Sequence, residues 1–304
     1  MNKKNYFLDF ISYHFTKLKR KSLIGLTQLV LIFYKRKISE ELILIMKKNR
    51  DHLRTVKEFL PEGEYDHVNN NYGIQNYIFS NLKNEIDLFP TYTDVLVLLI
   101  KELNFKKPIY LEIGTSVFKN FQQIENFLEE SILYGYDMNN LITTIHDKYN
   151  FKSMTEETSN QEYFHSKEKN EIYYFKNNVL SKEGAEIFKN LLKGKINVIF
   201  SDALHSEEGI ISEYENIVKN NLSNEFIYYF DDLNMYDVQA GVEKVFKDIK
   251  INNEKVRFYS FWTYGWIGQY EKLHKIGLIT SLDINSLLTE KKLSLPLFKE
   301  VTNV

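Results

Sequence analysis

Short apolar runs alternate with helical stretches from residue 108 onward. Seven of these runs have the length and the aromatic and β-branched content of buried strands: 109–113, 132–137, 171–175, 196–202, 226–232, 257–263 and 275–281. The stretches between the first five runs are long enough for crossover helices, whereas the last two runs have no helical stretch between them and are expected to pair antiparallel. The pattern predicts an α/β protein with a doubly wound, mostly parallel seven-stranded sheet covered by helices on both faces.

The first third of the chain has helical patterns instead. Ser39 is expected to cap a helix that ends near Leu60, just before a proline. Thr91 and Asp94 form a capping pair ahead of the apolar run VLVLLIKEL, which predicts a second helix. The pattern divides the chain into a helical N-terminal region (1–72), an α/β domain (73–283) and a C-terminal tail (284–304).

The composition is that of a globular protein in a reducing compartment. Hydrophobic residues make up 43% of the 304 residues and charged residues 26%, which excludes a disordered chain. Cysteine is absent, so the chain has neither disulfides nor thiolate metal sites, and we expect a cytoplasmic location.

The net charge of −2 hides an uneven distribution. Residues 1–60 carry 14 Lys and Arg against 5 Asp and Glu, a balance of +9, so the remainder has a balance of −11. The basic segment is interpreted as a solvated helical surface or as a peripheral contact with an anionic surface. Within it, the apolar residues 22–34 are too few to span a bilayer, which needs about 20. We therefore expect no transmembrane segment, but a core or dimer-interface helix, and hence a homo-oligomer; interfacial membrane contact is the alternative.

The first two strands of the predicted sheet end in residues suited to a nucleoside. Ligands of doubly wound sheets collect beyond the carboxyl ends of the strands. The first strand contains Glu112 and ends at Gly114, while Ser116 and Lys119 stand where a dinucleotide motif would have its later glycines. Asp137 ends the second strand, 23 residues after Gly114, where a carboxylate can accept hydrogen bonds from ribose hydroxyls. A plain strand-to-helix turn and an Asx turn are the alternatives.

Carboxylates and a histidine follow the fourth and fifth strands. Asp202 and His205 follow one strand, and Asp231 and Asp232 end the neighbouring one. Three carboxylates at one edge repel each other unless a cation is present, and oxygen ligands favour Mg²⁺, Ca²⁺ or Mn²⁺. His205 is a candidate proton acceptor, because an imidazole titrates near neutral pH. The alternatives are helix caps, turn residues and a structural histidine; the other six histidines have no comparable neighbours in the sequence.

Four segments, YLEIGTS, LYGYDMN, NVIFSDALHSEEG and YYFDDLNMYDVQAGVEKVF, resemble the Rossmann-like class I S-adenosylmethionine-dependent methyltransferases. The resemblance covers residues 105–282 and is strongest to the metal-dependent sugar O-methyltransferases of the macrocin O-methyltransferase type. Carried over by position, it implies a cofactor site of Glu112, Gly114, Thr115, Ser116, Asp137, Asn177 and Asn178, a Mg²⁺ (or other hard divalent cation) site of Asp202, Asp231 and Asp232, and His205 as the general base.

The resemblance implies methyl transfer from S-adenosylmethionine to a hydroxyl of a small molecule, a sugar or glycoside. Trp262, Tyr264 and Trp266 are candidates for stacking on the acceptor, or for packing between the last two strands. The sequence leaves three other functions as alternatives.

A nucleic-acid methyltransferase would use the basic N-terminal region, but no N/D-P-P-Y/F segment is present. A non-catalytic binding module has no reason to keep the acidic cluster, and a metal-dependent oxygenase would normally have more histidine ligands.

Overall fold

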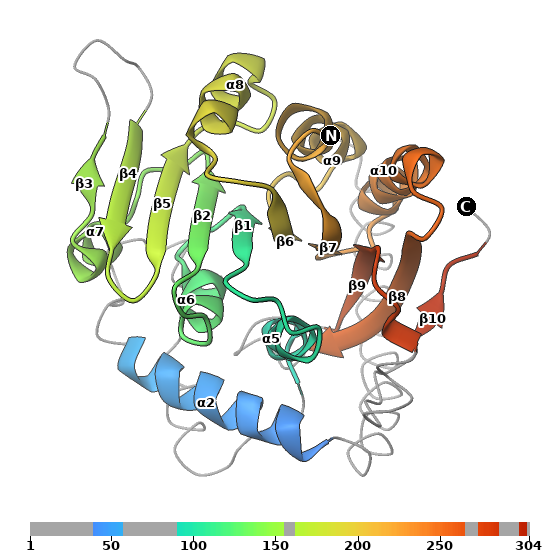
Figure 1. Ribbon diagram of the computed structural model, residues 1–304, viewed down its shortest axis with the longest axis horizontal. Coiled ribbons are helices and arrows are strands. Elements are labelled where there is room, and N and C mark those ends of the chain that lie inside the picture. The colour runs from blue at the N-terminus through green and yellow to red at the C-terminus, as the bar shows by residue number, and fades with distance from the viewer. Residues whose placement is uncertain (1–38, 57–89, 155–161, 265–272, 286–297, 303–304) are drawn as a thin grey trace, which may run out of the picture.

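The centre of the computed structural model is a ten-stranded sheet (Figure 1). The structure describes residues 39–56, 90–154, 162–264, 273–285 and 298–302. In chain order the strands are β1 (Ile109–Ile113), β2 (Ile132–Asp137), β3 (Lys152–Ser153), β4 (Glu162–Lys167), β5 (Glu171–Lys176), β6 (Ile196–Ser201), β7 (Leu222–Phe230), β8 (Arg257–Tyr264), β9 (Leu273–Thr280) and β10 (Lys299–Glu300). Their order across the sheet is β10-β8-β9-β7-β6-β1-β2-β5-β4-β3.

All seven predicted strands are present, as β1, β2 and β5 to β9. The five strands β5-β2-β1-β6-β7 run parallel, and β9 lies antiparallel between β7 and β8, which confirms the predicted pairing of the last two strands. The strand order changes direction between β1 and β6, so the fold is doubly wound and Rossmann-like, as the sequence predicted. The three strands that were not predicted lie at or next to the two edges of the sheet, and β3 and β10 have two residues each.

Helices cover both faces of the sheet (Figure 1). One face carries α5 (Tyr92–Glu102), α6 (Lys119–Glu125) and α7 (Thr143–Tyr149), with α2 (Glu40–Val56) packed on α5 and α6. The other face carries α8 (Lys182–Leu191), α9 (Glu207–Glu213) with the π-helical turn Tyr214–Val218, and α10 (Tyr236–Asn252). The seven strands β1, β2 and β5 to β9 therefore present side chains to two separate cores, which explains the continuous apolar runs in the sequence.

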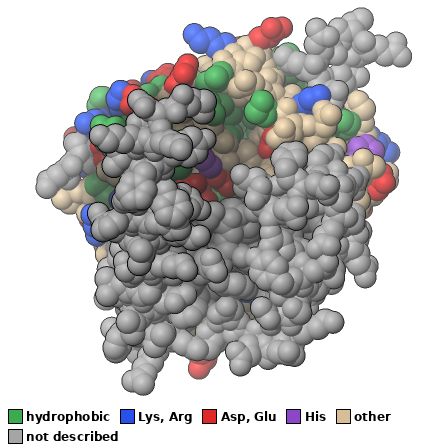
Figure 2. All heavy atoms as spheres, turned by 180° about the vertical axis from the view of Figure 1, so that it is seen from behind, with side chains coloured by type: hydrophobic (Ala, Val, Ile, Leu, Met, Phe, Trp, Pro, Cys, Tyr) green, Lys and Arg blue, Asp and Glu red, His purple; other side chains and the backbone are tan. Residues whose placement is uncertain are grey.

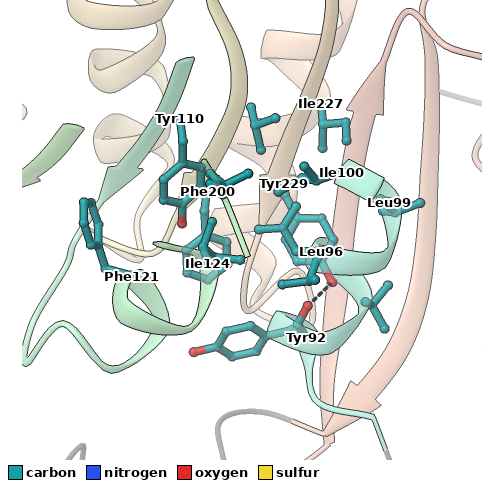
Figure 3. Close-up of a cluster of buried hydrophobic side chains, with 14 of the residues drawn as sticks. Tyr92, Leu96, Leu99, Ile100, Tyr110, Phe121, Ile124, Phe200, Ile227 and Tyr229 are labelled. Carbon is teal, nitrogen blue, oxygen red and sulfur yellow. Dashed lines mark hydrogen bonds between the residues drawn. The ribbon is translucent and has the colours of Figure 1, made fainter. Parts of the chain in front are cut away.

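The core beneath α5 includes Tyr92, Leu96, Tyr110, Phe200 and Tyr229, drawn in Figure 3. The hydroxyl of Tyr229, on β7, donates a hydrogen bond to the main-chain oxygen of Tyr92 at 3.1 Å. The start of α5 is thereby fixed to the centre of the sheet.

The structure confirms the predicted start of both N-terminal helices. The Ser39 hydroxyl accepts a hydrogen bond from the main-chain nitrogen of Leu42 at 3.2 Å. Thr91 and Asp94 form a reciprocal capping box at the start of α5. The helix end predicted near Leu60 lies outside the described residues, as do the apolar segment 22–34 and Trp266.

No helix in the described parts of the chain is long and apolar enough to cross a bilayer. Trp262, one of the candidate stacking residues, is half-buried on β8. The three-part division of the chain stays a prediction, because most of residues 1–72 and 284–304 lies outside the described ranges.

Candidate active site

Gly114 forms a very close backbone contact between two strands at the point where the strand order reverses. Its φ of +88° is one that L side chains rarely adopt. Its main-chain nitrogen donates to the oxygen of Tyr136 at 2.8 Å, and the nitrogen of Asp202 donates to the oxygen of Ile113 at 2.9 Å. A Cβ at Gly114 would lie 2.3 Å from the main-chain oxygen of Asp202. Glycine is therefore required at this position both by the dihedral angle and by the space available.

The turn that follows keeps the shape of a glycine-rich loop with only one glycine. Ser116 and Phe118 have positive φ values of 47° and 62°. The sequence suggested Ser116 and Lys119 as the positions of the missing glycines; the second left-handed residue is Phe118, and Lys119 begins α6. Because a left-handed non-glycine residue costs about 1–2 kcal/mol, the surrounding structure must hold this turn in place.

A pocket opens at the carboxyl ends of β1 and β6. Its lining includes four of the predicted cofactor residues, Glu112, Gly114, Thr115 and Ser116. Asp202, from the predicted metal set, lines the same pocket. The structure therefore brings two groups of residues that are 86 positions or more apart in the sequence to one cavity.

Glu112 is only 1% exposed, and its carboxyl group is held in place by two side chains. Its Oε2 accepts hydrogen bonds from the hydroxyl of Tyr110 at 2.5 Å and from Nδ2 of Asn120 at 2.9 Å. Burial raises the pKa of Glu112 to about 8 despite these two hydrogen bonds. At neutral pH this pocket carboxyl therefore keeps its proton and is a neutral hydrogen-bonding group.

The pocket lining does not include three of the predicted cofactor residues, Asp137, Asn177 and Asn178. Oδ2 of Asp137 accepts from the main-chain nitrogen of Ser116 at 2.8 Å, while Oδ1 accepts from the main-chain and side-chain nitrogens of Asn139, both at 2.9 Å. The Asx turn that the sequence allowed is thus formed, and the same carboxylate ties the glycine loop to β2. Asn177 donates its main-chain N–H to the oxygen of Asp137 at 2.7 Å, and Asn178 is exposed next to it.

Two histidines connect the three predicted metal-binding aspartates. Nε2 of His205 lies 3.0 Å from Oδ1 of Asp202, and its Nδ1 lies 3.8 Å from Oδ2 of Asp232. Nδ1 of His274 lies 2.7 Å from Oδ1 of Asp231 and 3.3 Å from Oδ1 of Asp232. Potential ligand atoms of Asp231, Asp232 and His274 all lie within 4.8 Å of one another. Asp202 is outside this group, on the far side of the His205 imidazole.

His274 is the site residue that the sequence did not reveal. The prediction that no histidine other than His205 has such neighbours is wrong, because His274 contacts both Asp231 and Asp232 in the folded chain. His274 lies 42 positions after Asp232, and only the antiparallel pairing of β9 with β7 brings it to the acidic pair. Acidic and histidine side chains lie side by side on the face of the molecule shown in Figure 2.

The carboxylates raise the pKa of both histidines. The hydrogen bond to Asp202 raises the pKa of His205 to about 9, although burial opposes it. Burial lowers the pKa of His274, but the charges of Asp231 and Asp232 outweigh it, so the net change is upward. The imidazole of His205 therefore carries a proton at neutral pH when no cation compensates the charge of the carboxylates.

Replacing Glu213 by glutamine is expected to remove a pH-dependent loss of stability. This α9 residue is 1% exposed, and its Oε1 accepts from the Tyr228 hydroxyl at 2.8 Å. Burial raises its pKa from 4.5 to about 7, so the folded state binds the proton more tightly and stability falls as pH rises from about 4.5 to 7. The loss in unfolding free energy is on the order of 3 kcal/mol above pH 7. Glu213→Gln should therefore raise the melting temperature at pH 8 but not at pH 4.

Glu215→Gln, an exposed change two residues away, is the matched control and should show no such difference between the two pH values. Equal effects of Glu213→Gln at pH 4 and pH 8 would show that the raised pKa is wrong.

Comparisons with known proteins find similar structures but no similar sequences. No protein-family model and no curated protein matches the chain. A structure of the plantazolicin methyltransferase BpumL in complex with SAH is 12% identical, with a TM-score of 0.41, and the match covers 79% of this chain and 98% of that one. The O-methyltransferase TomG from Streptomyces achromogenes, in complex with SAM, is 13% identical, with a TM-score of 0.44 and coverage of 75% and 94%. An O-methyltransferase from Bacillus cereus, in complex with SAH, is 13% identical, with a TM-score of 0.43 and coverage of 74% and 95%. The fold assignment above rests on the strand order and pairing, independently of these similarities.

Proposed function

We propose that this protein is an S-adenosylmethionine-dependent, divalent-metal-dependent O-methyltransferase that acts on a hydroxyl of a small molecule, a sugar or glycoside. One observation supports this proposal above all others. Asp202 lines the pocket that contains Glu112 and Gly114, and the same carboxylate lies 3.0 Å from the imidazole of His205. Asp202 thus belongs to the cofactor pocket and also contacts the proposed proton acceptor. Group transfer to a hydroxyl requires the methyl donor and the proton acceptor to be close together in this way.

The donor atoms near Asp232 suit a divalent cation. Two carboxylates and one imidazole converge within 4.8 Å, and Asp202 adds a third carboxylate across His205. Carboxylate ligands favour Mg²⁺ and Mn²⁺, and the imidazole of His274 extends the choice towards Mn²⁺ and Fe²⁺. This is a change from the oxygen-only set expected from the sequence.

The pocket residues bind and orient, and His205 moves the proton. S-adenosylmethionine would supply the methyl group and leave as S-adenosylhomocysteine, and a dication held by the aspartates would supply charge that acidifies the acceptor hydroxyl and lowers the pKa of the neighbouring imidazole. Asp202 holds His205 through Nε2, which leaves Nδ1 as the atom that accepts the hydroxyl proton. The side chain of His205 is 40% exposed, so an acceptor reaches it from solvent.

Removal of divalent metal is expected to abolish methyl transfer, and Mg²⁺ or Mn²⁺ to restore it. The test is a methyltransferase assay with a panel of small glycosides, before and after treatment with EDTA, together with calorimetric titration of Mn²⁺ into the metal-free protein.

Replacing His274 by glutamine should weaken Mn²⁺ binding by about tenfold or more if the imidazole is a ligand.

His146→Gln, a change on α7 away from the acidic cluster, is the matched control and should leave Mn²⁺ affinity unchanged. Full activity in EDTA would refute metal dependence, and failure to bind S-adenosylmethionine or S-adenosylhomocysteine would refute the proposed function as a whole.

We propose a cytoplasmic location, which the absence of cysteine supports. Self-association through the apolar segment 22–34 also remains a proposal, as does peripheral contact of residues 1–60 with an anionic surface. A nucleic-acid substrate is not favoured, because the sequence has no N/D-P-P-Y/F segment.

A further inference from the structure

The first turn of α5 forms one wall of the pocket. Tyr92 lines the pocket together with Glu112 and Asp202. Its ring stacks on Phe200 at a centroid distance of 5.1 Å and lies 6.1 Å from the ring of His274. The Tyr92 ring therefore lies between the cavity and the histidine of the acidic cluster.

Thr93, the next residue of α5, is connected to the pocket carboxyl of Glu112 by hydrogen bonds through Asn120. The hydroxyl of Thr93 donates to Oδ1 of Asn120 at 2.6 Å, and Nδ2 of Asn120 donates to Oε2 of Glu112 at 2.9 Å. All of these groups are buried. A displacement of the α5 start would therefore move both a pocket wall and the hydrogen bond that orients the pocket carboxyl.

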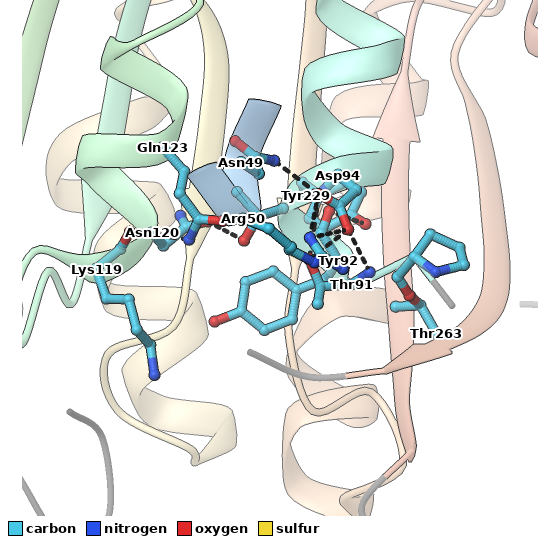
Figure 4. A network of polar contacts seen from close by, with 12 residues as sticks. Asn49, Arg50, Thr91, Tyr92, Asp94, Lys119, Asn120, Gln123, Tyr229 and Thr263 are labelled. Carbon is cyan, nitrogen blue, oxygen red and sulfur yellow. Dashed lines mark hydrogen bonds and ion pairs between the residues drawn. The ribbon is translucent and has the colours of Figure 1, made fainter. Parts of the chain in front are cut away.

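The α5 start is held from outside by a buried ion pair with α2 (Figure 4). Nη1 of Arg50 lies 2.9 Å from Oδ1 and 2.8 Å from Oδ2 of Asp94, and the two side chains are 1% and 0% exposed. Nδ2 of Asn49 also donates to Oδ1 of Asp94, at 2.6 Å. The same carboxylate accepts the main-chain N–H of Thr91 at 2.8 Å. One carboxylate thus joins α2 to the cap of α5.

The ion pair is not explained by stability alone. Burying two charges costs several kcal/mol in desolvation, and apolar residues of similar volume are often as stabilising. A threonine alone is an adequate helix cap. What the pair supplies is one fixed geometry, because the Arg50 nitrogen and the Asp94 oxygens fit in a single arrangement. On the sheet side the same turn is fixed by Tyr229, which donates to the Tyr92 oxygen, and by Thr263, which donates to the Pro90 oxygen at 2.6 Å.

We propose that Arg50, acting through Asp94, is a positioning residue that holds the Tyr92 ring against the bound nucleoside cofactor. Helix α2 would then be part of the active site rather than a separate appendage. The inference deepens the proposed function and rests on it, because Tyr92 contacts a ligand only if the pocket binds one.

The test is a double-mutant cycle on the affinity for S-adenosylhomocysteine, measured by calorimetric titration of the full-length protein. Tyr92→Leu removes the ring, and the pair Arg50→Met with Asp94→Asn removes the ion pair without leaving a buried charge. Each change alone is expected to weaken binding by about tenfold, the equivalent of one well-placed contact. In the Tyr92→Leu background the paired change should cost little further affinity, because its effect passes through the ring that is already absent.

Three further measurements separate positioning from general stabilisation. Arg50→Lys, with Asp94 unchanged, should bind S-adenosylhomocysteine more tightly than Arg50→Met/Asp94→Asn, since it keeps a positive charge opposite the Asp94 carboxylate. Glu41→Gln, which breaks the exposed contact of α2 with Lys101 on α5, is the matched control and should leave affinity unchanged. Melting temperature and circular dichroism report folding of every variant.

Equal affinity of the folded Arg50→Met/Asp94→Asn protein and the wild type would overturn the inference, as would an equal loss in both Tyr92 backgrounds. If the wild type binds no S-adenosylhomocysteine at all, the proposed function fails, and this inference fails with it; binding by the wild type with no coupling between the changes refutes the inference alone.

Discussion

Replacing His205 by alanine is expected to lower kcat by about 10²- to 10⁴-fold while leaving the affinity for S-adenosylhomocysteine unchanged. In the proposed mechanism the imidazole accepts the proton at Nδ1, because Asp202 lies 3.0 Å from Nε2. It is not part of the pocket lining at Glu112 and Gly114, so the cofactor contacts stay intact. The measurement is a steady-state assay on the metal-loaded enzyme, with calorimetric titration of the same preparation.

His146→Ala serves as the control for the loss of an imidazole as such. His146 lies on α7, with its side chain 41% exposed beside Asp147, and its removal should not change kcat. If His205→Ala turns over at the wild-type rate, another group accepts the proton, and His205 has no role in the chemical step.

Gly114→Ala is expected to lower the unfolding free energy by about 3 kcal/mol and to reduce kcat/KM by about a hundredfold. A methyl group there would lie 2.3 Å from the main-chain oxygen of Asp202, and the residue would keep an unfavourable φ of +88°. The only relief is to move the ends of β1 and β6 apart, which displaces Asp202 from the pocket. Urea unfolding and a steady-state methyltransferase assay measure the two effects, and calorimetric titration of S-adenosylhomocysteine measures the affinity of the pocket.

Gly194→Ala is the matched glycine substitution. Its Cβ would meet the flexible Cδ1 end of Ile109 at 2.8 Å, without a main-chain obstacle, so a much smaller loss is expected. Should Gly114→Ala bind the nucleoside as tightly as the wild type, the pocket beside Gly114 is not the cofactor site.

The sequence predicted the central elements well because their signals are local. The seven apolar runs became β1, β2 and β5 to β9, and the caps at Ser39 and Thr91 were found from the residues that make them. The strand β4, next to the edge of the sheet, was missed, since its sequence EYFHSK mixes charged, polar and aromatic residues as one exposed face requires. The two-residue strands β3 and β10 carry too few residues for any periodicity.

The candidate site was predictable only where its residues follow strands. Glu112, Gly114 and Asp202 meet because parallel strands end at the same edge, a consequence of the predicted topology. His274 was missed because it comes from an antiparallel strand whose position beside β7 no local pattern reveals. The ion pair of Arg50 and Asp94 was also missed. The two residues are 44 positions apart on different helices, and charged residues on helices are usually solvated.

The sequence by itself determined the kinds of elements, their order and the chemical character of the strand ends, because periodicity, capping and turn residues act over a few positions. Only the tertiary structure decided which side chains share a site. It placed the His205 imidazole between Asp202 and Asp232, added His274, and packed α2 against α5, whose first turn lines the pocket. These contacts depend on strand register and helix packing, which are set by the whole core rather than by any single segment.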